Sequence, residues 1–101
     1  MKSQYIMEKG CLVVYVPREL DHHQANRIRT ETDLLIDTYH VRHLVFDFTE
    51  TEFMDSSGIA LILRSQQRMQ LLDGSVVIRN IPAQAKRVLD AAGIGRLVSI
   101  K

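Results

Sequence analysis

The sequence has no tryptophan, a single cysteine and only two prolines in 101 residues. One cysteine excludes an internal disulfide, and because Cys11 lies in the apolar run 11–16 it is most simply a small buried side chain. Three tyrosines and three phenylalanines are the only aromatic residues, so the core must be built mainly from aliphatic side chains.

Charge and hydropathy exclude two further classes of protein. The formal net charge is +1 and the basic residues are scattered among acidic ones, so we expect no nucleic-acid partner. The longest apolar runs fall far short of the roughly 20 residues that cross a bilayer. The opening Met1-Lys2-Ser3-Gln4 does not begin a signal peptide. We therefore expect no membrane partner and a cytoplasmic protein.

What the sequence does contain is typical of one globular domain over residues 1–101. Hydrophobic residues make up 46% and charged residues 25%, which is enough for one aliphatic core. Apolar runs between turn residues predict strands over residues 4–8, 11–16, 41–48, 75–79 and 97–100. Apolar residues at helical spacing predict helices over residues 22–38, 59–72 and 82–92.

The order β-β-α-β-α-β-α-β predicts an α/β fold, a small mixed, mostly parallel sheet with about three packed helices. Lys9-Gly10 predicts a hairpin turn that makes the first strand antiparallel, and Asp21 predicts a helix N-cap. Right-handed crossovers allow the helices to lie on one face of the sheet or on both.

The first predicted helix has two distinct faces. The face toward the sheet should carry Ala25, Ile28, Thr32, Leu35 or Ile36, and Tyr39. The opposite, solvated face should carry Gln24, Arg27, Glu31 and Asp37.

The segment Phe53-Met54-Asp55-Ser56-Ser57-Gly58 joins a predicted buried strand to a predicted helix. Asp and Ser oxygens often accept the free N–H groups of a first helical turn, so capping is one explanation of these residues. Modification is the other. A serine at an exposed helix start is open to a kinase, and a phosphate there would meet free N–H groups and the positive end of the helix dipole.

Catalysis and metal binding find little support. His22 and His23 are adjacent, so on a helix they point about 100° apart and cannot chelate as an i, i+4 pair would. No G-x-S-x-G elbow surrounds Ser56 or Ser57, and no glycine-rich phosphate-binding motif occurs. We expect a protein that is not an enzyme and that holds no metal and no cofactor.

The junction, taken with Glu19-Leu20-Asp21-His22-His23 upstream, resembles the STAS-domain anti-sigma factor antagonists of Gram-positive bacteria. The hallmark of that family is a strand, an Asp-Ser-Ser-Gly junction and a helix, here the strand 44–49 and a helix from about Ser57. Residues 74–78, 82–89 and 92–94 are also similar to the family. The resemblance covers nearly the whole chain and implies the STAS fold.

The resemblance implies a partner switch in sporulation or stress response. Such a protein, when unphosphorylated, binds an anti-sigma factor that is also a serine kinase, and the sigma factor is released for transcription. The kinase phosphorylates the first serine of the pair, and a PP2C-type phosphatase reverses this. Carried over, the phosphoacceptor is Ser56, with Ser57 as its neighbour and helix cap, and Asp21 matches an acid in the partner-facing loop. ATP would belong to the partner kinase.

The same resemblance gives a partner-binding surface around the junction. Its members are Glu19, Leu20, Asp21, His22, His23, Asp55, Ser57, Gly58 and Ile59. Arg64 and Gln67 could extend it along the second helix, and a solvated helix face explains the charged members equally well. Pro17-Arg18 and Ala60 stand where relatives often have glycine, and relatives often carry one more helix after the last strand.

Two other functions fit parts of the same pattern. A non-switching STAS scaffold or ligand-sensing module would share the fold and would bind its partners whatever the state of Ser56. An esterase-like enzyme would lose ester turnover when Ser56 or Ser57 is replaced by alanine. The partner switch requires that an acidic substitution at Ser56 changes binding to the anti-sigma kinase.

Overall fold

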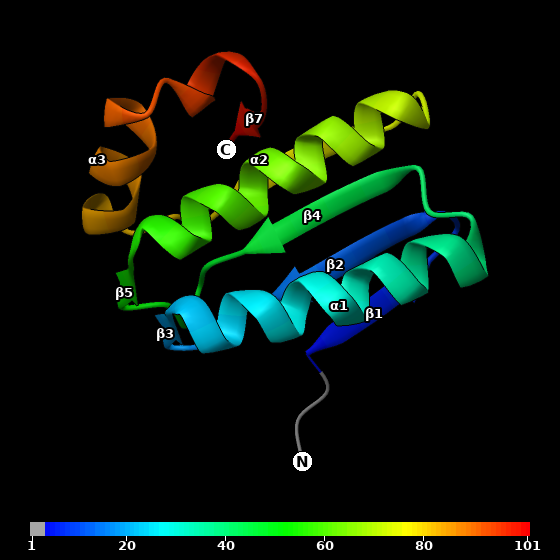
Figure 1. Cartoon of the computed structure of the whole chain (residues 1–101), viewed down its shortest axis with the longest axis horizontal. Coiled ribbons are helices and arrows are strands. Elements are labelled where there is room, and N and C mark those ends of the chain that lie inside the picture. The colour runs from blue at the N-terminus through cyan, green and yellow to red at the C-terminus, as the bar shows by residue number, and fades with distance from the viewer. Residues whose placement is uncertain (1–3) are drawn as a thin grey trace.

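In the described part of the chain, a five-stranded sheet carries three helices on one face, and a separate pair of very short strands lies beyond the carboxyl ends of its central strands (Figure 1). The computed structural model describes residues 4–101, so the prediction about a signal peptide falls mainly outside the described residues. The elements are, in chain order, β1 (Tyr5–Glu8), β2 (Cys11–Tyr15), β3 (Glu19–Leu20), α1 (His22–Tyr39), β4 (His43–Asp47), β5 (Phe53–Met54), α2 (Ser56–Leu71), β6 (Ser75–Arg79), α3 (Ala83–Ala91), the 3-10 helix η1 (Ile94–Arg96) and β7 (Ser99–Ile100).

The strand order of the main sheet is β1-β2-β4-β6-β7. Only β1 is antiparallel to its neighbour, and the other pairs are parallel, which confirms the predicted mixed, mostly parallel sheet. The crossovers through α1, α2 and α3 all move along the sheet in the same direction. Because such crossovers are right-handed, this order places the three helices on one face, which resolves the alternative left open by the sequence.

The N-terminal hairpin forms as predicted at Lys9-Gly10. Both residues have positive φ, 49° and 78°, which is the backbone of a type I′ turn. The turn pairs Glu8 with Cys11 and sets the register of β1 on β2.

The core lies between the sheet and the helices. Along β2, β4 and β6, alternate residues are buried, as expected when one face is covered: Leu12, Val14, Leu44, Phe46, Val76 and Ile78. Helices α1, α2 and α3 add Ile28, Ile36, Leu61, Ile62, Met69 and Leu89. Each such side chain stabilises the fold by roughly 1.5–3 kcal/mol relative to exposure. Residues on the other face, such as Val13, Val45 and Val77, are only half-buried.

Helix α1 packs on the sheet through Ala25, Ile28, Thr32 and Ile36, as predicted. The prediction for Tyr39 was wrong, because its side chain is 57% exposed. The helix ends at this residue, His40 takes a left-handed conformation with φ of 53°, and the chain turns back so that Val41 fills the core instead.

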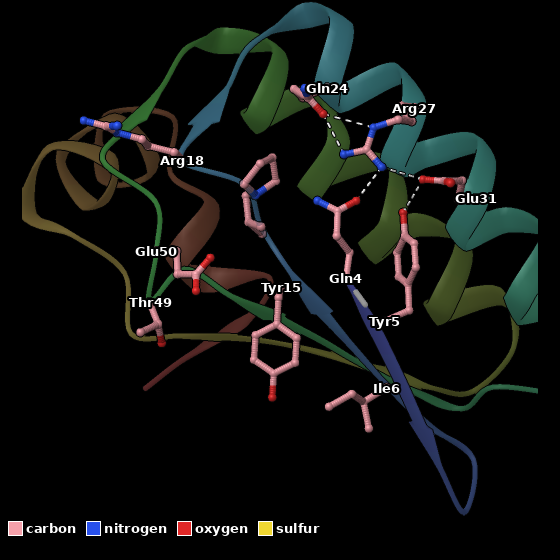
Figure 2. Close-up of a pocket in the computed structure, with 12 residues that line it drawn as sticks. Gln4, Tyr5, Ile6, Tyr15, Arg18, Gln24, Arg27, Glu31, Thr49 and Glu50 are labelled. Carbon is pink, nitrogen blue, oxygen red and sulfur yellow. Dashed lines mark hydrogen bonds and ion pairs between the residues drawn. The ribbon is translucent and has the colours of Figure 1, made fainter. Parts of the chain in front are cut away.

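The polar face of α1 is not simply solvated, which corrects the prediction for Gln24, Arg27 and Glu31. The guanidinium of Arg27 donates to Gln24, to Glu31 and to Gln4, which directly precedes β1 (Figure 2). The Tyr5 hydroxyl donates to Glu31 Oε1 at 2.6 Å. Burial, and then this hydrogen bond, raise the pKa of Tyr5 above its usual range. These side chains therefore tie the edge strand β1 to α1.

The remaining differences lie at element ends. Helix α2 begins at Ser56, three residues before the predicted start, because Asp55 caps it. The last strand is reduced to Ser99–Ile100, since Leu97 and Val98 form the turn that follows η1. The strands β3 and β5 were not predicted at all. In residues 4–101 no helix combines the length and the apolar character that a bilayer crossing requires.

Candidate functional site

The two-stranded sheet joins the segments that surround the site. Strands β3 and β5 run parallel, with Glu19 opposite Phe53 and Leu20 opposite Met54. The Asp55 N–H donates to the Leu20 carbonyl oxygen at 3.3 Å and continues this pairing. Because α1 and α2 start directly after β3 and β5, both helices begin at the same edge of the molecule (Figure 1).

Each of these helices is capped by an aspartate. Asp21 Oδ1 accepts a hydrogen bond from the Gln24 N–H at 2.9 Å, and Asp55 Oδ1 accepts one from the Ser57 N–H at 2.8 Å. Asp21 is thus the N-cap that the sequence predicts. The prediction that Ser57 caps α2 was wrong. The helix already begins at Ser56, so its N-cap is the preceding residue, Asp55, whose carboxylate accepts a hydrogen bond from the Ser57 N–H.

Ser56 is the first residue of α2 and is exposed. Among residues 4–101, no hydrogen bond engages the hydroxyl of Ser56 or that of Ser57. Asp55, and not Ser56, caps the helix. The Ser56 hydroxyl lies on the N-terminal turn, where free backbone N–H groups and the helix dipole favour an added negative charge.

Buried apolar residues form the floor of the site. Leu20 and Met54 are fully buried, and Gly58 lies buried against them. A Cβ at Gly58 would lie 2.6 Å from Met54 Sδ and 2.9 Å from Leu20 Cδ2, so only glycine fits there without a shift of its neighbours. The prediction that Leu20 and Gly58 contact a partner needs correction, because both are covered by their own chain and shape the site from beneath.

Gln84 of α3 holds the strand that leads into the site. Its Oε1 accepts a hydrogen bond from the Met54 N–H, and its Nε2 donates to the Met54 carbonyl oxygen, both at 3.2 Å. One side-chain amide thus pairs with the free edge of β5 as a neighbouring strand would. Gln84 was not identified from the sequence, where its one signal is a polar side chain on the first turn of the predicted helix.

Asp47 anchors the loop between β4 and β5. The carboxylate is 4% exposed and accepts hydrogen bonds from the Thr49 N–H and the Arg79 Nε–H, both at 2.8 Å. Burial alone would raise the pKa of Asp47, but the hydrogen bonds from Thr49, Arg79 and Asn80 outweigh it and lower the pKa to about 2. Asp47 is therefore a fully bonded anchor rather than a reactive group.

The other predicted contact residues surround Ser56 at different depths. Glu19, His22 and His23 are exposed, and Ile59 is half-buried. His22 Nε2 lies 3.1 Å from Asn26 Nδ2 on the next turn. Further along α2, Arg64 pairs with Asp33 of α1 at 3.3 Å, and Gln67 is exposed.

Histidines and metal-binding clusters are the features that would accompany catalysis by these serines. Within the described residues no histidine hydrogen-bonds to Ser56 or Ser57. In that same part of the chain, no three His, Cys, Asp or Glu side chains gather where a metal ion could bind. What the site does offer is the exposed Ser56 hydroxyl, which no hydrogen bond within residues 4–101 engages, on the first turn of a helix that Asp55 caps.

A large open hollow lies elsewhere, between β1, α1 and the loops that follow β2 and β4 (Figure 2). Its volume is about 1270 Å³. The charged groups that line its α1 side already bond to one another, as described for Arg27 and Glu31. It therefore offers a ligand few unsatisfied groups on that side.

The sequence has curated relatives. An anti-sigma F factor antagonist from Paenibacillus polymyxa is 30% identical over 102 residues, which cover 99% of this chain and 87% of that protein. Another from Lysinibacillus sphaericus is 27% identical over 90 residues, which cover 89% of this chain and 77% of that protein.

The fold is similar to solved structures of SpoIIAA, at 26% identity over 97% of this chain. The anti-sigma factor antagonist SpoIIAA in its unphosphorylated form matches with a TM-score of 0.87, and 86% of its chain is covered. The Bacillus cell fate determinant SpoIIAA in the phosphorylated form matches with a TM-score of 0.80, and 89% of its chain is covered.

The family comparison agrees with the fold. The STAS domain model matches residues 4–101, which is the whole of the described chain. The three helices and the mixed, mostly parallel sheet are the predicted STAS fold. This chain belongs to the STAS domain family.

Proposed function

We propose that this protein is an anti-sigma factor antagonist whose binding to its anti-sigma factor is switched off by phosphorylation of Ser56. The observation that carries the proposal is the state of Ser56, exposed and unbonded on the first turn of a helix that another residue caps. The names of the curated relatives support it, and so does the existence of SpoIIAA in unphosphorylated and phosphorylated forms.

A phosphate on Ser56 would act differently on the free protein and on the complex. In the free protein it adds about −1.5 to −2 charges at the positive end of α2, where the helix dipole offsets part of its repulsion from Asp55. In a complex, a partner would press the same phosphate against Asp21 and Asp55 and strip it of water, which costs far more. The fold would therefore persist while the interface is lost.

The proposed partners follow from this chemistry. The anti-sigma factor would also be the serine kinase and would supply the ATP, and a PP2C-type phosphatase would restore the hydroxyl. The antagonist itself would need no cofactor and no catalytic group. We expect the cycle to run in the cytoplasm and to control a sigma factor of sporulation or stress response.

Phosphorylation and binding can be tested together with the anti-sigma F factor of the organism that carries this chain. Intact-mass and peptide mass spectrometry after incubation with ATP should find one phosphate, on Ser56. Ser57→Ala is the matched control and should still be phosphorylated, whereas Ser56→Ala should not. Ser56→Asp should weaken binding at least tenfold, a change of about 1.4 kcal/mol.

The outcomes separate the proposal from its alternative. Tight binding without phosphorylation, and equal affinity of Ser56→Asp and the unaltered chain, would indicate a non-switching STAS scaffold. A phosphate on Ser57 or elsewhere would contradict the assignment of the site. Absence of both phosphorylation and binding would contradict the proposed function.

A further inference from the structure

A groove runs between the first halves of α1 and α2, and we call it the α1–α2 groove. Its volume is about 210 Å³. Each helix contributes one stripe at i, i+3, i+4 and i+7: His22, Ala25, Asn26 and Arg29 from α1, and Ser57, Ala60, Leu61 and Arg64 from α2.

Small side chains keep this groove open. Ala25 and Ala60 face each other where longer residues would close the seam between the helices. Further along, the seam is closed by ion pairs. Arg68 Nη1 lies 2.7 Å from Asp33 Oδ1, and its Nη2 also donates to Asp37. The groove is therefore confined to the helix ends that adjoin Ser56.

The groove carries positive charge that the protein itself uses only in part. No acidic residue lines it, whereas Arg29 and Arg64 do. Within residues 4–101 the side chain of Arg29 makes no hydrogen bond or ion pair. Arg64 reaches Asp33 at 3.3 Å, but Arg68 holds that carboxylate more closely, so Arg64 can turn to another anion.

The position of the groove ties it to the proposed switch. His22 directly follows the cap Asp21, and Ser57 directly follows Ser56. A protein that covers Ser56 therefore lies over the mouth of the groove. Its floor is apolar through Ala25, Ala60 and Leu61, and its far end is basic.

We propose that the α1–α2 groove receives an acidic segment of the anti-sigma partner. An aliphatic side chain of that segment would lie on the two alanines, and one or two carboxylates would pair with Arg29 and Arg64. The inference rests on the proposed function and names the chemistry of its partner. The groove would orient the partner. Its basic end favours acidic groups of the partner, whereas the acidic caps at the other end of the contact, near Ser56, favour basic groups.

Two substitutions test the groove and should leave the fold intact. Ala60→Leu fills the groove from an exposed helical position where leucine is as helix-compatible as most residues. Arg29→Gln removes the unpaired charge. Arg87→Gln, on the exposed surface of α3, is the matched control with the same change in net charge. Measured by circular dichroism, the thermal midpoint of each of the three variants should lie within a few degrees of that of the unaltered chain.

Isothermal titration calorimetry with the anti-sigma F factor of the same organism is the readout. Ala60→Leu and Arg29→Gln should each weaken binding at least tenfold, and Arg87→Gln should not. The affinity of Arg29→Gln should also fall less steeply with added salt, because it has lost an ionic contact.

Two results would overturn the inference in distinguishable ways. If Ala60→Leu and Arg29→Gln bind as Arg87→Gln does while Ser56→Asp still weakens binding at least tenfold, the groove is not used and the switch stands. If the unaltered chain does not bind the anti-sigma factor, the proposed function fails, and the groove proposal fails with it.

Discussion

Replacement of Gly58 by alanine tests how tightly the site is packed on its floor. Gly58 lies in the first turn of α2, where its Cα faces Met54 and Leu20. In an exposed helix the substitution would stabilise the protein by up to about 1 kcal/mol, because alanine is the better helix former. The packing predicts the opposite result.

The magnitude follows from the two contacts. The added methyl group would meet the Met54 Sδ at 2.6 Å and the Leu20 Cδ2 at 2.9 Å, closer than real Cβ atoms approach their neighbours. Both neighbours are fully buried and cannot swing into solvent. Overpacking of this kind costs about 1–3 kcal/mol, and two confined contacts favour the upper end. The net effect should be a loss of about 2 kcal/mol.

Urea denaturation followed by circular dichroism measures this loss. The midpoint should fall by about 1 M, since a domain of this size has a slope of roughly 1–3 kcal/mol per M. Gly95→Ala is the control, because a Cβ there would meet only Ile100 Cδ1 at an ordinary 3.7 Å. It should be neutral or slightly stabilising. A Gly58→Ala variant as stable as the unaltered chain would refute the close packing of Met54 and Leu20 beneath Ser56.

Substitutions at three further residues test the groups that position the site. Gln84→Ala should destabilise the protein by about 1–3 kcal/mol, because it leaves both backbone groups of the buried Met54 unbonded. Unchanged hydrogen exchange of the Met54 amide would contradict the two hydrogen bonds between Gln84 and Met54. The pKa of Asp47 is about 2 in the folded protein, below its unfolded value of about 3.9. The Asp47 carboxylate therefore contributes about 2 kcal/mol to the free energy of unfolding above pH 4, and this contribution is lost as the pH falls toward 2. Urea denaturation at a series of pH values should show this loss, and Asp47→Asn should be less stable at pH 7 and flatter between pH 4 and 2; equal slopes would refute the assignment. Asp55→Ala should lower the free energy of unfolding by about 1 kcal/mol while Asp55→Ser largely retains it, and equal losses would show that capping is not its role.

The elements that the sequence predicts well are those with a repeating pattern or a terminal signal. The helix that follows Asp21 has four buried residues at helical spacing. The hairpin turn at Lys9-Gly10 requires positive φ at both residues, which few residue types adopt readily. Strands β3 and β5 are two residues long, which is too short to show an alternation of apolar and polar residues. Their pairing depends on contacts between residues more than 30 positions apart, which no local pattern carries.

The site shows the same division. Asp21, Asp55 and Ser56 could be named from the sequence because cap residues at helix starts are a local signal, reinforced by the family resemblance. The clamp of Gln84 on Met54 could not, because it requires the third helix to reach back to β5. The α1–α2 groove could not be named either. It arises from two alanines on different helices, and their facing positions are fixed only when both helices pack on the sheet.

Helix α2 is capped by Asp55, and within residues 4–101 no hydrogen bond engages the neighbouring Ser56 hydroxyl. A group added to that oxygen displaces no internal partner, and its removal leaves no gap to be refilled. If Ser56 carries the phosphate, each molecule could pass through the cycle repeatedly with no refolding step. The speed of the response would then be set by the opposing enzymes alone, and a constant pool of the protein could report a changing signal without new synthesis.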